Sequence, residues 1–184
     1  DNLKAILNLT NACKKKLAKR LIHCSTAVIS GRTPSRYISE EIADHPYSYY
    51  EKTKAKIEQL LIDETKNSLL ELAILRPTCV FGPNGKNLEK LINDLATGSK
   101  LKNYLKSCLF NRRTMNLVSI YNVTSTLLFL SEYKEVINDE IFIISDDEFE
   151  ENNFRYVEQE LIKSLQIKDF KIPKLYCPSK LGFS

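Results

Sequence analysis

Short apolar segments alternate along this chain with longer amphipathic ones, and this alternation is the strongest constraint on its fold. The spacing of apolar residues predicts strands at 20–28, 71–75, 115–121 and 140–144, and helices at 2–19, 48–66, 88–98, 123–130 and 154–165. The segments 32–47 and 77–85 hold prolines and glycines without such a period and are predicted to be loops. Strands that alternate with helices pair in parallel, because each helix returns the chain to the same end of the sheet. We therefore expect an α/β fold with a parallel sheet flanked by helices.

The composition is that of a folded chain with its own core. Of 184 residues, 43% are hydrophobic and 27% are charged, which excludes a disordered tail. The net charge is only +4, and the one compact basic run, 14–20, falls at a predicted helix end, where cations complement the helix dipole. No apolar run reaches the roughly 20 residues of a membrane span. We therefore expect neither a nucleic-acid partner nor a membrane span.

The cysteines and the acidic residues bear on compartment and metal binding. Five cysteines without a C-x-x-C pair predict buried thiols in a reducing compartment, and so a cytoplasmic protein. The acidic run at 146–151 lacks the glycine and the ligand spacing of a calcium loop. We expect residues 146–151 to form a solvated loop and not a metal site.

The start of the helix predicted at 48–66 carries the residues that most suggest chemistry. Ser48 and Glu51 form a capping-box pattern, which predicts that the helix begins here. Tyr50 and Lys54 are four residues apart and so lie on one helical face. A nearby ammonium stabilises the phenolate form of tyrosine, so such a pair can exchange a proton with an alcohol or a carbonyl.

The spacing of this pair is weak evidence by itself. From the composition alone, a packed aromatic residue and a solvated lysine are the more common explanation of Tyr50 and Lys54. The same spacing occurs at Tyr176 and Lys180, where Pro178 lies between the two residues and argues against a shared helix face.

Three segments around Tyr50 and Lys54 resemble those of one family. Residues 24–31 resemble the S-S/T-x-x-V-Y-G segment of the extended short-chain dehydrogenase/reductase family, the nucleotide-sugar epimerases and dehydratases. Residues 46–54 resemble its P-Y-x-x-S-K segment, and residues 75–83 its L-R-P-x-x-V-Y-G-P segment. The order and spacing match over nearly the whole chain. The resemblance implies a Rossmann-like fold truncated at the N-terminus, with residues 1–83 as the second half of the Rossmann domain. Residues 84–184 would be mostly a small substrate-binding portion, interleaved with the last Rossmann strands.

The same resemblance implies a catalytic set of Thr26, Tyr50 and Lys54 that acts on a nucleotide-diphosphate sugar with a nicotinamide cofactor. Thr26 would hydrogen-bond the sugar oxygen, with Ser25 packed behind it, while Tyr50 moves the proton. Lys54 would hold the ribose hydroxyls of the cofactor and tune the tyrosine. His23, in the middle of a predicted strand, is expected to be a core residue and not a catalytic one.

Five further positions follow from the resemblance. Pro77 and Val80 fall where the backbone of such proteins wraps around the nicotinamide ring. Cys79 occupies a substrate-facing position that is often asparagine in epimerases, although a simply buried cysteine fits equally well. Asn87 resembles a residue that reaches the substrate diphosphate, or it caps the next helix. Arg113 could hold a phosphate in place of an arginine nearer the strand, or it is a surface residue.

One expected motif is missing. The glycines lie at Gly31, Gly82, Gly85, Gly98 and Gly182, so the G-x-x-G-x-x-G phosphate loop of the family is absent. In the family this loop precedes the segments found here. We therefore expect the sequence to be part of a longer enzyme, and these 184 residues alone to be inactive.

The resemblance implies a nucleotide-sugar epimerase or 4-keto-reductase that uses NAD or NADP in surface polysaccharide synthesis, with a homodimer as a possible assembly. Dehydratases of the family place an Asp-Glu pair after the catalytic hydroxyl residue, whereas Ala27 and Val28 follow Thr26 here. Dehydration is therefore disfavoured. The alternative is a non-catalytic regulatory or binding protein on the same fold, for which the missing glycine loop argues.

Overall fold

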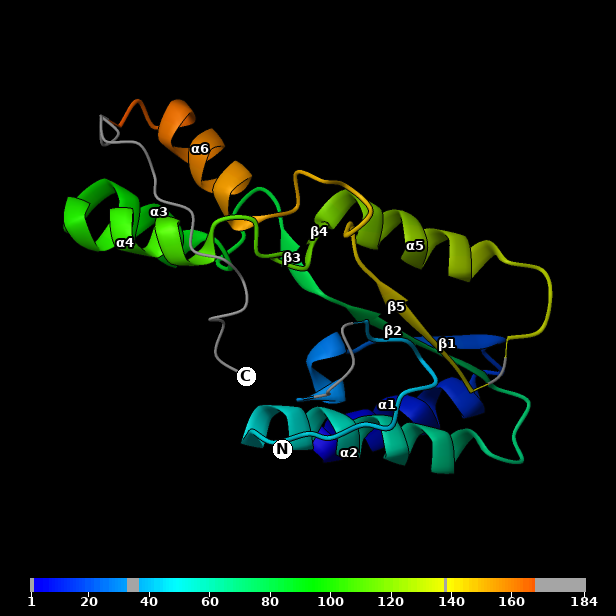
Figure 1. The fold of residues 1–184 in the computed structure, drawn as a ribbon. Helices are drawn as coiled ribbons and strands as arrows, with labels where there is room; N and C mark the ends of the chain where they lie inside the picture. Colours follow the sequence, from blue (N-terminus) through cyan, green and yellow to red (C-terminus); the bar gives the residue numbers. More distant parts are fainter. Residues whose placement is uncertain (1, 33–36, 138, 168–184) are drawn as a thin grey trace. The chain divides into compact units, whose positions relative to one another are not determined.

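Two separate parallel sheets organise the chain (Figure 1). The structure is a computed structural model that describes residues 2–32, 37–137 and 139–167. The chain divides into a first unit, Asp1–Thr78 with Tyr121–Ile144, and a second unit, Cys79–Ile120 with Ser145–Ser184. The expected α/β class with parallel strands flanked by helices is confirmed.

The first unit is built on a three-stranded sheet. Its strands are β1 (Arg20–Cys24), β2 (Glu71–Pro77) and β5 (Glu140–Ile144), in the order β1-β2-β5. All neighbours are parallel, and His23 of β1 lies opposite Ile74 of β2. The carboxyl ends of the three strands therefore lie at the same edge, where parallel α/β sheets bind ligands.

Helices cover both faces of this sheet (Figure 1). The helices α1 (Asn2–Lys15) and α2 (Tyr49–Thr65) lie on one face, and α5 (Ile120–Glu132) lies on the other. Side chains alternate between the faces, because successive residues of a strand point in opposite directions. On the α2 face the buried core consists of Ile57, Leu61, Leu72 and Ile74. On the α5 face it consists of Ala73, Leu130 and Ile137.

The second unit has a two-stranded parallel sheet and three helices. The strands are β3 (Cys79–Phe81) and β4 (Leu117–Ser119). The helices are α3 (Glu89–Thr97), α4 (Lys100–Phe110) and α6 (Phe154–Ser164). Helix α4 contacts both α3 and α6. The loop before α6 is tied to the sheet by Asn152, whose side-chain amide exchanges two hydrogen bonds with the backbone of Leu117.

The predicted strand at 20–28 is wrong beyond Cys24. The chain turns there into a short 3-10 helix, η1 (Ala27–Ser30). Thr26 caps it, because its Oγ1 accepts a hydrogen bond from the Val28 amide. Apolar residues at 27–29 made this segment look like a strand, but the local cap redirects the backbone.

Two other elements differ from the prediction. The helix α4 was not expected, although Leu101, Leu105 and Leu109 have helical spacing. The predicted loop at 77–85 contains strand β3, which pairs with β4 almost 40 residues later. Local periodicity carries no information about such a distant pairing, so the sequence alone could not reveal it.

The prediction that the cysteines are buried thiols is wrong at one position. All four that lie in the described residues are free, and Cys24 is exposed, so the prediction of buried thiols is wrong at this position. Cys24 is the last residue of β1, at the carboxyl end of the strand. Cys177, Tyr176, Pro178 and Lys180 lie outside the described residues. Among the described helices, none is long and apolar enough to cross a membrane.

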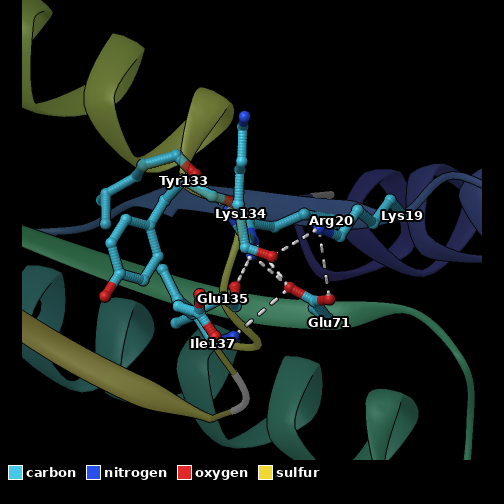
Figure 2. A network of polar contacts seen from close by, with 8 residues as sticks. Lys19, Arg20, Glu71, Tyr133, Lys134, Glu135 and Ile137 are labelled. Carbon is cyan, nitrogen blue, oxygen red and sulfur yellow. Dashed lines mark hydrogen bonds and ion pairs between the residues drawn. The ribbon is translucent and has the colours of Figure 1, made fainter.

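A buried arginine joins the beginnings of β1 and β2 to the segment after α5 (Figure 2). The side chain of Arg20 is only 5% exposed, and its Nε donates to the Glu71 carboxylate at 2.8 Å. Its Nη1 and Nη2 donate to Glu71 and to the carbonyl oxygens of Leu130, Tyr133 and Glu135. All five guanidinium N–H groups thus have acceptors, as a buried arginine requires.

Glu71 is held as a carboxylate by the same contacts. Burial opposes its charge, but the hydrogen bonds from Arg20 and the Ile137 amide outweigh this effect and lower the pKa of Glu71. The ion pair therefore fixes three segments that are distant in sequence at the amino-terminal edge of the sheet.

We expect Arg20→Met to destabilise the protein, because it leaves Glu71 and three backbone carbonyls without their donor. Removing one partner of a buried ion pair costs on the order of 3 kcal/mol. Lys19→Met is the matched control, since the Lys19 side chain is 63% exposed and lies 4.0 Å from the same carboxylate. Its effect should stay within about 0.5 kcal/mol. Urea denaturation of the chain measures both, and equal losses for the two variants would contradict this account.

The ion pair should also leave a signature in acid. Because the pKa of Glu71 is lowered in the folded state, the carboxylate contributes stability above its unfolded pKa, near 4.5. This contribution disappears as the pH falls through the folded pKa. The difference in unfolding free energy between wild type and Glu71→Gln should therefore be constant near neutral pH and shrink below about pH 4.5. A difference that does not change with pH would show that the charge of Glu71 contributes nothing.

Candidate active site

The candidate hydroxyl residue, Thr26, follows the carboxyl end of β1. The Ser25 amide donates to the Leu75 carbonyl at 2.7 Å, which continues the β1–β2 pairing by one residue. Ser25 is buried, and within the described part of the chain its hydroxyl has no hydrogen-bond partner. Thr26 follows in an extended conformation and remains half-exposed. Thr26 is therefore accessible at the edge of the sheet, whereas Ser25 is buried.

Gly31 lets the chain before α2 approach η1 closely. It has φ of +64°, and a Cβ atom at this position would lie 1.9 Å from the carbonyl oxygen of His45. Only glycine tolerates both the left-handed backbone and this contact. The segment around His45 therefore passes directly against the end of η1.

The start of α2 is fixed by the predicted capping box. The Ser48 hydroxyl accepts from the Glu51 amide at 3.2 Å, and the Glu51 carboxylate accepts from the amides of Ser48 at 3.1 Å and Tyr47 at 2.7 Å. These bonds, that from Tyr47 foremost, lower the pKa of Glu51. Because the cap fixes Tyr49 as the first helical residue, it also fixes the positions of Tyr50 and Lys54 in the first turns.

Tyr50 and Lys54 occupy the accessible end of α2. Tyr50 is 56% exposed and Lys54 is half-exposed. The helix contacts both η1 and β2. The charge of Lys54 acts on His23 and on Cys24, the last two residues of β1. The ammonium of Lys54 therefore lies near the carboxyl end of β1, next to the segment that carries Thr26.

The pKa values of His23 and Cys24 reflect this position. Burial lowers the pKa of His23, the Lys54 charge lowers it further, and Glu58 opposes both. Although Cys24 is exposed as a residue, partial burial of its thiol raises the pKa, and Lys54 partly offsets this effect. His23 is therefore neutral at pH 7, and its buried Nε2 has no partner among the described residues, although the residue as a whole is only half-buried.

Near the carboxyl end of β2, the buried guanidinium of Arg76 binds two carboxylates. Its side chain is 3% exposed, and it donates to both Glu58 oxygens at 2.6–3.2 Å and to both Asp44 oxygens at 2.6–2.8 Å. Burial disfavours its charge, but the bonds to Glu58 and Asp44 outweigh this and raise the pKa of Arg76. The network joins β2, α2 and the segment that precedes α2.

Arg76, Glu58 and Asp44 carry no local motif that predicts this network. One signal was available: Glu58 is a charged residue four positions after Lys54, next to the apolar Ile57 of the core face. A charge at such a position needs a buried partner, and Arg76 in the L-R-P-like segment is one.

Four of the other candidates belong to the second unit. Val80 and Asn87 come together, because the Asn87 side-chain amide donates to the Val80 carbonyl at 2.6 Å. Asn87 does not cap α3, whose cap residue is Leu88 without a side-chain bond. Burial raises the pKa of the half-buried Cys79. The guanidinium of the exposed Arg113 stacks over the Phe110 ring at 5.8 Å.

The candidates thus fall into two groups. Thr26, Tyr50, Lys54 and Pro77 belong to the first unit, and Cys79, Val80, Asn87 and Arg113 belong to the second. A cavity of about 510 Å³ in the second unit is lined by other residues, among them Arg112, Asp147 and Arg155. The described residues contain no group of three His, Cys, Asp or Glu side chains placed to hold a metal ion.

Fold and site together define an α/β protein with a tyrosine–lysine pair at the carboxyl edge of a parallel sheet. The family model of the NAD dependent epimerase/dehydratase family matches residues 1–135. The chain therefore belongs to the NAD-dependent epimerase/dehydratase family, and the resemblance seen in the sequence is confirmed.

Individual relatives agree with this assignment. A UDP-glucose 4-epimerase from Vibrio cholerae is 28% identical over 148 residues, which are 79% of this chain and 44% of that protein. The structure of UDP-glucuronic acid 4-epimerase from Bacillus cereus in complex with NAD superposes with a TM-score of 0.69 at 23% identity, over 96% of this chain and 57% of that one. RMD from Pseudomonas aeruginosa, complexed with NADPH, has a TM-score of 0.68 at 19% identity, over 94% and 61%. The chain thus spans about half the length of these relatives.

Ser48→Ala tests the cap that positions α2. Loss of the hydroxyl leaves the Glu51 amide without its acceptor, and we expect a loss of about 1 kcal/mol in unfolding free energy. Thr53→Ala is the matched control on the same helix, because its hydroxyl only bonds the Tyr49 carbonyl within the helix. Its effect should be within about 0.5 kcal/mol. Denaturation curves in which both variants match wild type would argue against the cap.

Proposed function

We propose that the protein containing this chain is a nucleotide-sugar 4-epimerase or 4-keto-reductase that uses NAD or NADP. The observation that carries the proposal is the position of Lys54. Its ammonium acts on the end of β1, beside Thr26, and lies on the same helical face as the accessible Tyr50. The family membership and the NAD- and NADPH-bound structures that share the fold give further support.

The chemistry of the residues fits part of a nicotinamide cofactor. Among the described residues, no hydrogen bond or ion pair holds the Lys54 ammonium, so its three donors are available to ribose hydroxyls. The phenol of Tyr50 is accessible next to it. The cofactor diphosphate has no counterpart in this sequence, because its five glycines do not form the G-x-x-G-x-x-G turn. We infer that Lys54, Tyr50 and the backbone near Pro77, all in the first unit, hold the nicotinamide end. Val80, in the second unit, is a cofactor-binding candidate from the family resemblance alone.

In this proposal the side chains of the first unit move and orient the reacting proton. When bound, the cofactor supplies the hydride acceptor and donor for the sugar carbon. Tyr50 takes the proton from the sugar hydroxyl and returns it, while the positive charge of Lys54 stabilises the phenolate. Thr26 hydrogen-bonds the same sugar oxygen and keeps it aligned with Tyr50.

The second unit supplies the candidates for substrate recognition. Arg113 is an exposed guanidinium that suits a phosphate. Asn87 and Cys79 would contact the diphosphate and the sugar, respectively. The relatives named for UDP-sugars favour a nucleotide-diphosphate sugar as the substrate class. We place the enzyme in the cytoplasm, in surface polysaccharide synthesis, and as a possible homodimer.

A non-catalytic binding protein on the same fold is the second candidate. In such a protein Tyr50 would be an ordinary aromatic residue and Lys54 a solvated lysine, without a catalytic role. Residues 1–184 contain no G-x-x-G-x-x-G turn, and we expect these residues by themselves to show no turnover.

Tyr50→Phe in the whole protein separates the two candidates. Removing one hydroxyl should lower kcat by about 10²–10⁴-fold, because the acid/base group is lost. Tyr49→Phe is the matched control: this neighbouring tyrosine is 88% exposed, and its loss should leave kcat unchanged. The measurement is interconversion of UDP-sugars with NAD or NADP. Equal activity of wild type and Tyr50→Phe would exclude the proposed mechanism.

A further inference from the structure

The hydrogen-bond network of Arg76, Glu58 and Asp44, here called the Arg76 network, can determine where the Lys54 side chain points. Glu58 follows Lys54 by one helical turn, and Lys54 follows Tyr50 by one turn, so the three side chains share a face of α2. Glu58 is pinned to β2 through three hydrogen bonds from Arg76. Because a helix rotates as a rigid element, a fixed Glu58 also fixes the rotation of Tyr50 and Lys54 about the helix axis.

Asp44 adds a second constraint. It binds the other edge of the same guanidinium and so ties the segment before α2 to β2. This segment also passes against Gly31 at the end of η1. The network therefore sets both the rotation of α2 and the entry of the chain into its first turn, where Tyr50 is located.

The pKa of His23 depends on the position of α2. His23 lies on β1 opposite Ile74, and both Lys54 and Glu58 of α2 act on it electrostatically. Its Nε2 is buried. Lys54 therefore affects His23 only while α2 keeps its rotation, which makes the interaction between the two side chains a measure of that rotation.

We propose that Arg76 is a positioning residue for the Tyr50–Lys54 pair: held by Glu58 and Asp44, it directs Lys54 towards the carboxyl end of β1. This inference rests on the proposed function, in which that pair carries the proton chemistry. It assigns a role to a buried residue that would not touch the substrate.

A merely stabilising role makes a different prediction. Replacing both partners of a buried ion pair by apolar residues of similar size often preserves stability. The double variant Arg76→Met/Glu58→Met should therefore remain folded. If the network only stabilises, this variant keeps Lys54 beside His23; if it positions, the variant loses that proximity.

The test is a coupling between His23 and Lys54, measured by proton NMR on the chain itself. The sequence has only two histidines, and the exposed His45 is an internal control. In wild type, Lys54→Met should raise the pKa of His23, because it removes a cation that disfavours the imidazolium. In the Arg76→Met/Glu58→Met background, we expect Lys54→Met to leave the His23 pKa unchanged, with loss of the coupling.

Arg76→Lys provides a second background in case the double variant does not fold. Lysine keeps the charge but lacks the planar fork that binds two carboxylates at once, so the coupling should again be reduced. Full coupling in either folded background would overturn the proposal. The readout needs no turnover: if the coupling is lost but Tyr50→Phe remains active, the positioning role stands and the proposed function fails.

Discussion

A buried guanidinium between two carboxylates, Arg76 with Glu58 and Asp44, is the interaction on which the candidate site depends. It connects the core strand β2 to the helix that carries Tyr50 and to the segment that leads into it. Buried ion pairs contribute little net stability, because desolvation offsets the attraction. Their geometric requirement is strict, however, since an unpaired buried charge is costly. Because the planar guanidinium of Arg76 donates to both carboxylates in fixed directions, we infer that it specifies the rotation of α2.

Two buried arginines, one near each end of the strands, stabilise the three-stranded sheet. Arg20 joins the first residues of β1 and β2 to the segment after α5, and Arg76 holds α2 near the carboxyl end of β2. Between them lies an apolar core on both faces. The fully satisfied ion pair and the candidate catalytic residues thus lie at opposite ends of the strands. The amino-terminal edge is closed by a fully satisfied ion pair, whereas the carboxyl edge presents Thr26 and the accessible face of α2.

The sequence predicted those parts of the structure that depend on local patterns. The capping box placed the start of α2 correctly, and the strand at 140–144 was predicted with its observed bounds. The pairing of β3 with β4 and the ion pairs of Arg20 and Arg76 were missed, because they join residues far apart in the chain. The segment after Cys24 was misread, since a side-chain cap outweighed an apolar run. Residue types revealed the candidate pair, but only the fold shows what orients it.

In the proposed function, Tyr50 and Lys54 face a nicotinamide-bound sugar nucleotide at the carboxyl edge of the sheet. A crystal structure of the whole protein with NAD and UDP-glucose would show whether they do. We expect the Tyr50 hydroxyl at about 3 Å from the 4-oxygen of the sugar, with the Lys54 ammonium on the ribose hydroxyls. A sugar nucleotide bound elsewhere, with Tyr50 still facing solvent, would exclude the proposed mechanism.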